Sequence, residues 1–193
     1  SGAATDDGAL HSRVPDFDLT ITFQTLKPSH LLQPAARHMG RIVIADIGIA
    51  AESRLHVIER PSLRAPGPDD HKYSRGYVAV LAGEMPGASA LTPAAASRAG
   101  AGYVRLFAPF FVHGAPSAII QNPGTVFEAD SRIGAVAVGP GLGTGPAGRA
   151  ALQAALASGR PLILDADALN LLAGDNSLEL DGTPILTPHE GEF

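Results

Sequence analysis

Polar and titratable residues follow two apolar runs near the end of the chain, in an arrangement that could bind a small ligand. The run at 161–164 is followed directly by the aspartates of 165–167 and by Asn170, and the run at 184–186 is followed by 187–189, which ends in a histidine. In open α/β sheets, ligands bind at the carboxyl ends of the strands. The sequence therefore predicts a single ligand-binding edge that carries both segments.

The side chains in these segments allow more than one role. Asp165 and Asp167 are two residues apart, and paired carboxylates can hold a metal ion or act as acid and base. From spacing alone, an N-cap role for Asp167 is the stronger interpretation, because aspartate commonly occupies that position. Asn170 could cap the helix or contact a ligand. His189 could position a substrate or transfer protons, and it could equally be an exposed loop histidine.

Glycine-bearing loops follow two earlier apolar runs. The loop at 139–145 precedes a predicted helix, and backbone amides at such a turn can bind an anion. It lacks the Lys-Ser/Thr of a Walker loop, and a tight turn without a ligand fits the pattern as well. The loop at 82–88 follows the apolar run at 77–81, again at the ligand edge. Before that run, the basic pair at 71–72 could contact a phosphate or be simply exposed.

The elements that must position these residues alternate between strand and helix. This βαβ order predicts a three-layer α/β sandwich, with a mostly parallel sheet and helices on its faces. A segment rich in proline and glycine at 56–70 predicts a linker between units at 1–55 and 71–193. The predicted strands are 19–26, 41–45, 77–81, 103–108, 117–121, 135–138, 161–164 and 184–187, and the predicted helices are 31–39, 89–99, 146–157 and 168–173.

The composition argues against several classes of function. A net charge of −5 does not favour nucleic-acid binding. The absence of cysteine excludes disulfides and thiolate metal sites, and it favours a reducing compartment, so we expect a cytoplasmic protein. No apolar run is long enough to span a membrane, so we expect no membrane partner. No metal-ligand cluster and no Gly-x-Ser-x-Gly motif stands out.

Taken together, these motifs resemble one family, the ADP/ATP-dependent NAD(P)H-hydrate dehydratases of the ribokinase-like superfamily. The first 50 residues resemble the end of the Rossmann-like NAD(P)H-hydrate epimerase domain, which bacteria often fuse in front of the dehydratase. The dehydratase motifs occur here in the family's order as His71-Lys72, 83–88, 99–102, 139–143, 165–170 and 187–192, and the epimerase motifs as Ser1-Gly2, 19–23, Lys27-Pro28, His30-Leu31 and 46–49.

The resemblance implies an enzyme that repairs hydrated nicotinamide cofactors (NADHX and NADPHX). The epimerase interconverts the R and S hydrates, and the dehydratase phosphorylates the S hydrate with ADP or ATP and eliminates phosphate to restore NAD(P)H. The resemblance also implies a homo-oligomer, Mg²⁺ with the nucleotide and K⁺ in the epimerase domain. It assigns hydrate binding to Ala88, Gly141, Gly143 and His189, with Asp165 and Asn170 lining the same cleft, and a potassium ligand to Ser1.

The sequence departs from the family pattern at two places. Tyr73 stands where the family has glycine after His-Lys, and the loop at 83–86 replaces a Gly-Gly-Ser type loop, so the place of the nucleotide stays open. The family's catalytic aspartates are expected beyond Phe193 and before Ser1. We therefore expect no catalytic residue within these 193 residues, and a fragment that is inactive and poorly soluble on its own.

Two other functions fit the same sequence features. A small-molecule kinase of the ribokinase-like superfamily, acting on a sugar or a vitamin precursor, would share the fold. A non-catalytic module that senses nucleotide would use the same glycine-rich loop. The epimerase-like segment argues against the kinase, because those kinases do not carry one.

Overall fold

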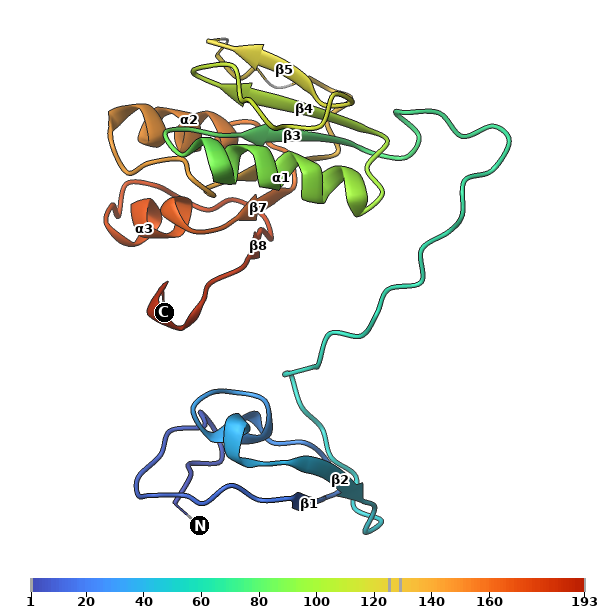
Figure 1. Cartoon of the computed structure of the whole chain (residues 1–193), viewed down its shortest axis with the longest axis vertical. Helices are drawn as coiled ribbons and strands as arrows, with labels where there is room; N and C mark the ends of the chain where they lie inside the picture. Colours follow the sequence, from blue (N-terminus) through green and yellow to red (C-terminus); the bar gives the residue numbers. More distant parts are fainter. Residues whose placement is uncertain (1, 125, 129, 193) are drawn as a thin grey trace. The chain divides into compact units, whose positions relative to one another are not determined.

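The chain forms two compact units in the computed structural model, Ser1–Leu63 and Arg64–Phe193 (Figure 1). The structure describes residues 2–124, 126–128 and 130–192. In the N-terminal unit, β1 (Leu19–Phe23) pairs in parallel with β2 (Arg41–Ala45). Their outward-facing apolar side chains, such as Ile21 and Phe23, are more than half exposed.

The connection between β1 and β2 differs from the helix predicted at 31–39. It contains two short 3-10 helices, η1 (Pro28–His30) and η2 (Ala35–His38). Pro34 lies between them and has no N–H to donate, which interrupts helical hydrogen bonding. The predicted helix is therefore wrong, although the segment still returns the chain to a parallel strand.

The C-terminal unit is built on a six-stranded sheet in which every neighbouring pair is parallel. The strand order is β5-β4-β3-β6-β7-β8, which confirms the predicted parallel α/β sheet. The strands are β3 (Tyr77–Leu81), β4 (Tyr103–Ala108), β5 (Ile120–Pro123), β6 (Ala135–Val138), β7 (Leu162–Leu164) and β8 (Ile185–Leu186), and the 3-10 helix η3 (Glu190–Glu192) follows.

Helices cover both faces of this sheet (Figure 1). Helix α1 (Pro86–Arg98) connects β3 to β4, whereas α2 (Pro146–Leu156) and α3 (Asp167–Ala173) follow β6 and β7. From β3 the chain adds β4 and then β5 on one side of the sheet, and from β6 it adds β7 and then β8 on the other side. Because βαβ crossovers are right-handed, α1 lies on one face and α2 with α3 on the other.

Side chains that alternate along β3 pack into the two hydrophobic clusters on either face of the sheet. Tyr77, Ala79 and Leu81 belong to the cluster under α2 and α3, whereas Val80 and Ala82 belong to the cluster under α1. All five residues are buried. A parallel strand that is covered on both faces is expected to read as a continuous apolar run, as this one does.

One predicted strand of this unit is displaced. The sequence predicts a strand at 117–121, but β5 covers Ile120–Pro123. Residues 116–119 form a turn closed by a hydrogen bond from the Ile119 amide to the Pro116 carbonyl, at 2.9 Å. Pro116 therefore delays the strand. Among the described residues, no helix combines the length and the apolarity needed to cross a bilayer.

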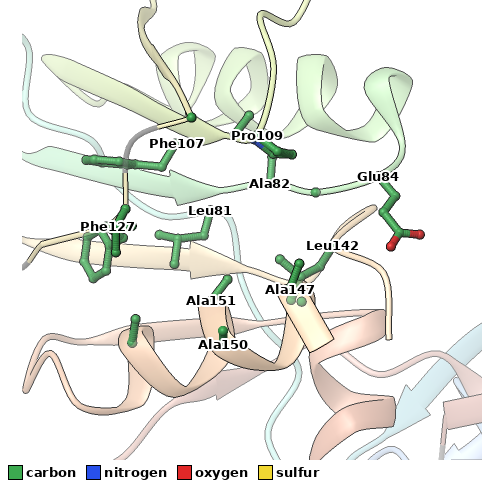
Figure 2. Close-up of a pocket in the computed structure, with 16 residues that line it drawn as sticks. Leu81, Ala82, Glu84, Phe107, Pro109, Phe127, Leu142, Ala147, Ala150 and Ala151 are labelled. Carbon is green, nitrogen blue, oxygen red and sulfur yellow. The ribbon is translucent and has the colours of Figure 1, made fainter. Parts of the chain in front are cut away.

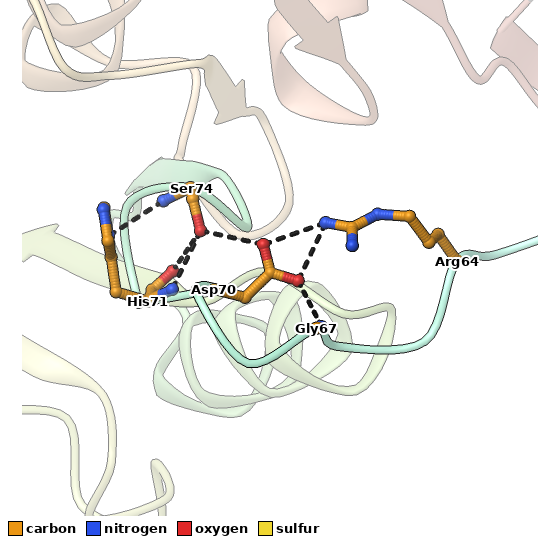
Figure 3. A network of polar contacts seen from close by, with 5 residues as sticks. All are labelled: Arg64, Gly67, Asp70, His71 and Ser74. Atoms are coloured by element: carbon orange, nitrogen blue, oxygen red, sulfur yellow. Dashed lines mark hydrogen bonds and ion pairs between the residues drawn. The ribbon is translucent and has the colours of Figure 1, made fainter.

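The segment leading into β3 is held by the Asp70 carboxylate (Figure 3). It accepts hydrogen bonds from the Gly67 amide at 2.7 Å, from the Arg64 guanidinium at 2.8 Å and from the Ser74 hydroxyl at 3.2 Å. These donors favour the charged form and lower the pKa of Asp70, with the Gly67 amide as the largest cause. The network fixes the start of the C-terminal unit.

Candidate active site

The strand order places a topological switch point between the carboxyl ends of β3 and β6. The chain runs from β3 to β4 and β5 on one side and then returns to β6 on the other side of β3. Connections leave these neighbouring strands towards opposite faces, and such a switch point opens a crevice where ligands bind in α/β sheets. Both glycine-bearing loops predicted from the sequence, 82–88 and 139–145, begin at this point.

The two loops touch through their backbones. The Met85 amide donates a hydrogen bond to the Gly141 carbonyl, at 3.1 Å. A Cβ on Gly83 would overlap the backbone carbonyl of Leu142, so a side chain there would force the loops apart. Leu142 itself is buried in the core beneath α2. The glycine at position 83 therefore serves a close backbone approach.

Helix α1 begins immediately after Met85, which makes this contact. Pro86 occupies its first turn, where the missing N–H costs nothing. The fully buried Ser89 donates its hydroxyl to the Met85 carbonyl at 2.8 Å. This bond ties the first turn of the helix to the loop that precedes it, and it fixes the position of Ala88 between them.

Asp167 holds the second loop. Its Oδ2 accepts a hydrogen bond from the Gly143 amide, at 2.8 Å. The sequence favoured an N-cap role for this aspartate, and that interpretation is wrong: the N-cap of α3 is Ala166, without a side-chain cap bond. Asp167 is the first residue of the helix, so its side chain is free to reach across to the turn after β6.

The turn after β7 lies against the loop at 139–145, and its backbone is strained. Ala166 has a φ of +46°, a conformation that side-chain-bearing residues rarely adopt. A Cβ on Gly139 would overlap the Asp165 carbonyl, so the two turns pass in close contact. Such strain persists only where surrounding structure enforces it, and it is typical of functional sites.

The structure brings several of the predicted binding residues together. A Cβ on Gly141 would lie 2.8 Å from the Cβ of Ala88, so the two positions are neighbours. Gly143 is tied to Asp167, and Asp165 precedes that residue at the same edge. Asn170 lies one turn into α3 and is exposed. Ser1, the predicted potassium ligand, lies outside the described residues.

Among the described residues, the polar contacts of His189 lie within its own turn. The chain reaches the edge with Thr187, whose amide donates to the Leu164 carbonyl at 3.1 Å. The His189 side chain is 75% exposed, and its Nε2 lies 3.2 Å from a carboxylate oxygen of Glu192. The structure thus places His189 after β8 at the carboxyl edge of the sheet, and within the part of the chain that the structure describes it makes no polar contact with the other predicted binding residues.

The basic pair at 71–72 lies at the other end of the sheet. It precedes the amino end of β3, opposite to the crevice, and the Lys72 Nζ lies 5.0 Å from the ring centroids of both Tyr73 and Tyr103. A phosphate in the crevice is therefore out of reach of this pair. The charge of Lys72 is used in cation–π contacts with these two rings.

The acidic groups do not form a metal centre within the described residues, where no group of three or more potential ligands converges. Asp167 is already engaged by the Gly143 amide. These residues do not fit a resident Mg²⁺ ion, because hard cations require several oxygen ligands.

Two contributors to the crevice were not recognised from the sequence. Glu84 points towards the glycine loop, and its carboxylate would be 2.7 to 2.9 Å from a Cβ on Gly143. Ser89 is hidden in an alanine-rich helix, where nothing local distinguishes it. For Glu84, the available signal was a charged residue in a glycine-bearing loop directly after a buried strand.

Comparison with known proteins agrees with this geometry. A sequence profile of the NAD(P)H-hydrate dehydratase family matches residues 78–193. The bifunctional NAD(P)H-hydrate repair enzyme of Mycobacterium tuberculosis is 38% identical over the whole chain, and the chain covers 42% of that enzyme. The chain thus spans less than half the length of this curated relative.

Solved structures show the same fold. An ADP/ATP-dependent NAD(P)H-hydrate dehydratase from Bacillus subtilis, co-crystallised with ATP and Mg²⁺, superposes with a TM-score of 0.56 at 29% identity, over 67% of this chain and 50% of that one. A ribokinase-like superfamily protein from Enterococcus faecalis superposes with a TM-score of 0.59 at 23% identity, over 66% and 50%. The C-terminal unit therefore has the ribokinase-like fold, and the chain belongs to the NAD(P)H-hydrate dehydratase family.

Proposed function

We propose that the full-length protein containing this chain restores NADH and NADPH from their hydrates, with ADP or ATP as the phosphoryl donor. The proposal is supported by the topological switch point between β3 and β6, where loops 82–88 and 139–145 contact each other through their backbones in a chain of the dehydratase family. The reaction phosphorylates the hydroxyl of the S hydrate and then eliminates phosphate, which forms the ring double bond.

In this proposal, the residues of the chain bind and orient the hydrate. We assign Ala88, Gly141 and Gly143 to the floor of the hydrate site, because they lie where loops 82–88 and 139–145 meet. Asp167 keeps the Gly143 amide in place. Asp165, Asn170 and His189 are proposed to complete the cleft, and His189 would have to turn from its own loop towards the ligand.

The remaining parts of the proposal concern the whole protein. We assign 1–55 to the end of an NAD(P)H-hydrate epimerase domain, 56–70 to a linker and 71–193 to the dehydratase domain. The epimerase would interconvert the R and S hydrates with K⁺ bound, and Ser1 is its proposed ligand. Mg²⁺ is proposed to accompany the nucleotide, and its role would be to neutralise charge on the transferred phosphate. A homo-oligomer in the cytoplasm remains our prediction.

The test is a repair assay on the full-length protein with NADH hydrate. The return of reduced-nicotinamide absorbance is followed with ADP, with ATP and with neither. The proposal predicts recovery that depends on nucleotide. Consumption of nucleotide with accumulation of a stable phosphorylated product, from the hydrate or from a panel of sugars and vitamin precursors, would instead identify a kinase and contradict the proposal.

A further inference from the structure

One residue of α2 connects the glycine loop at 139–145 to the far end of α3. The Arg149 amide donates a hydrogen bond to the Gly145 carbonyl at 3.0 Å, which closes the first turn of α2 against the end of that loop. The Arg149 guanidinium donates to the carboxylate of Asp175, which lies just beyond the C-terminal end of α3. The two helices that flank the candidate site are thus joined through this side chain.

The first turn of α2 is in close contact with the glycine loop. A Cβ on Gly148 would overlap the Gly143 carbonyl, so the helix and the loop meet backbone to backbone. Figure 2 shows Ala147, in the same turn of α2, beside Leu142 of the loop. Because such packed contacts do not deform continuously, a tilt of α2 is passed on to the position of Gly143.

The Asp175 carboxylate is held in place by its own turn. Its Oδ1 accepts hydrogen bonds from the Ser177 amide at 3.0 Å and from the Ser177 hydroxyl at 2.7 Å. The Leu178 amide donates to the Asp175 carbonyl at 3.1 Å, and Leu178 packs against the core under α2 and α3. Only 16% of the Asp175 side chain is exposed. An acceptor that is fixed and mostly buried costs the ion pair less ordering entropy, and it is less screened by salt, than a free surface partner.

Helix α3 is therefore attached at both of its ends. At its first residue, Asp167 accepts the Gly143 amide at 2.8 Å. Beyond its last turn, Asp175 accepts the Arg149 guanidinium. The strained residue Ala166 precedes the helix with a φ of +46°, and such strain persists only where surrounding structure enforces it. Two attachments fix the direction of α3, whereas one alone would leave the helix free to pivot about Asp167.

We propose that Arg149 and Asp175 are positioning residues for the hydrate site. Their ion pair holds α3 so that Asp167 keeps the Gly143 amide in the orientation that the hydrate requires. The inference rests on the proposed function, in which Gly143 belongs to the floor of the hydrate site. The pair acts on binding of the hydrate and not on the reacting atoms, so its loss should appear in KM more than in kcat.

The experiment combines two measurements on the full-length protein. One is the kinetics of NADH-hydrate repair, and the other is hydrogen–deuterium exchange of the Gly143 amide, followed in the peptides that contain it. Asp175→Asn and Arg149→Gln each remove one charge of the pair, and Arg149→Lys keeps it. Arg132→Gln is the matched control, because Arg132 forms a similar pair with Asp130 at the amino end of the sheet.

We expect Asp175→Asn and Arg149→Gln to raise KM for the hydrate by about threefold to tenfold, with kcat within about twofold of wild type. The Gly143 amide should exchange about threefold to tenfold faster in the same variants, because local opening becomes easier. Arg149→Lys and Arg132→Gln should stay within about twofold of wild type in both measurements. In the Asp167→Asn background, Asp175→Asn should raise KM by less than about a further twofold, because the bond through which it acts is already weakened.

Three results would overturn the proposal. The first is unchanged exchange of the Gly143 amide in both Asp175→Asn and Arg149→Gln. The second is an equal rise of KM in Arg132→Gln, which would indicate general destabilisation. The third is an undiminished effect of Asp175→Asn in the Asp167→Asn background. Failure of the wild-type protein to repair the hydrate, with exchange that still responds to the pair, would instead reject the proposed function and leave the coupling between the pair and the loop in place.

Discussion

The two ends of the six-stranded sheet are held by different kinds of contact. At the carboxyl end, glycines bring the backbones of 82–88 and 139–145 together, and the charged groups are carboxylates with few partners. At the amino end, aromatic rings and basic side chains satisfy one another. Tyr77 and Tyr103 meet with ring centroids 4.7 Å apart, and Arg132 lies 5.1 Å from the ring centroid of Tyr73.

This difference indicates which end is available to a ligand. Cation–π contacts occupy Lys72 and Arg132 at the amino end, and Asp130 pairs with Arg132 at 2.5 Å. The carboxyl end leaves Glu84 exposed beside the glycine turn. Variants at the two ends should therefore separate loss of function from loss of stability.

The largest effect is expected for Gly83→Ala at the carboxyl end. The new Cβ would overlap the Leu142 carbonyl, which is backbone and cannot move without separating the loops. We expect a loss of about 3 kcal/mol in the free energy of unfolding, typical of severe overpacking. Chemical denaturation measures it.

Gly87→Ala provides the control nearby, in the first turn of α1, because nothing lies within 4 Å of its Cβ position. It should be neutral or stabilising by up to ~1 kcal/mol, since alanine is favoured over glycine in a helix. Equal destabilisation by both variants would contradict the close loop contact.

Asp167→Asn is expected to have the next largest effect. It replaces the charged acceptor of the Gly143 amide with a neutral one. We expect a loss of about 1 to 2 kcal/mol in the free energy of unfolding, because hydrogen bonds to charged groups exceed neutral ones by that order. Asp181→Asn, an exposed aspartate outside the crevice, serves as the control and should lie within ~0.5 kcal/mol of wild type.

Tyr77→Phe should have a small effect of the opposite sign. The Tyr77 hydroxyl is buried and has no hydrogen-bond partner among the described residues, although Arg105 lies near it. Burial raises the pKa of Tyr77. Removing an unpaired buried hydroxyl should leave the free energy of unfolding unchanged or raise it by up to ~1 kcal/mol. A clear loss of stability would show that the hydroxyl does have a partner.

The smallest effect is the pH dependence of the Asp130 pair. Hydrogen bonds from Arg132 lower the pKa of Asp130 to about 2, from a usual value of 3.8. A lowered pKa in the folded state gives a contribution that is present above pH 3.8 and is lost as the pH falls towards about 2. Asp130→Asn should flatten the stability profile in this window, and added salt should shrink the difference, because the pair is exposed. A profile identical to that of wild type at low salt would argue against the pair.

The order and type of the elements in the C-terminal unit followed from sequence. The strands at 77–81, 103–108 and 135–138 match the predicted ranges, because each is a mostly apolar and mostly buried segment bounded by glycine or turn residues. The strand order could not be predicted, since it depends on pairing between distant segments. The helix predicted at 31–39 was wrong because Pro34 has no N–H to donate, and the segment forms two short 3-10 helices instead.

The candidate site was predictable at the level of segments. The loops after β3, β6 and β7 do meet at one edge, as strand-end polarity indicated. The partner of Asp167 could not be predicted, because Gly143 is 24 residues away and only the paired strands bring the two together. Whether His189 joins the cleft stays a prediction.

The most direct test of the account compares Asp167→Asn with Tyr77→Phe in the full-length protein, by measuring kcat/KM for NADH-hydrate repair. We expect a loss of about tenfold or more for Asp167→Asn, which corresponds to ~1.4 kcal/mol at the crevice. We also expect a change of less than about twofold for Tyr77→Phe, at the opposite end of the sheet. Equal losses in both variants, or full activity in Asp167→Asn, would contradict the assignment of the active site to the carboxyl edge of β3 and β6.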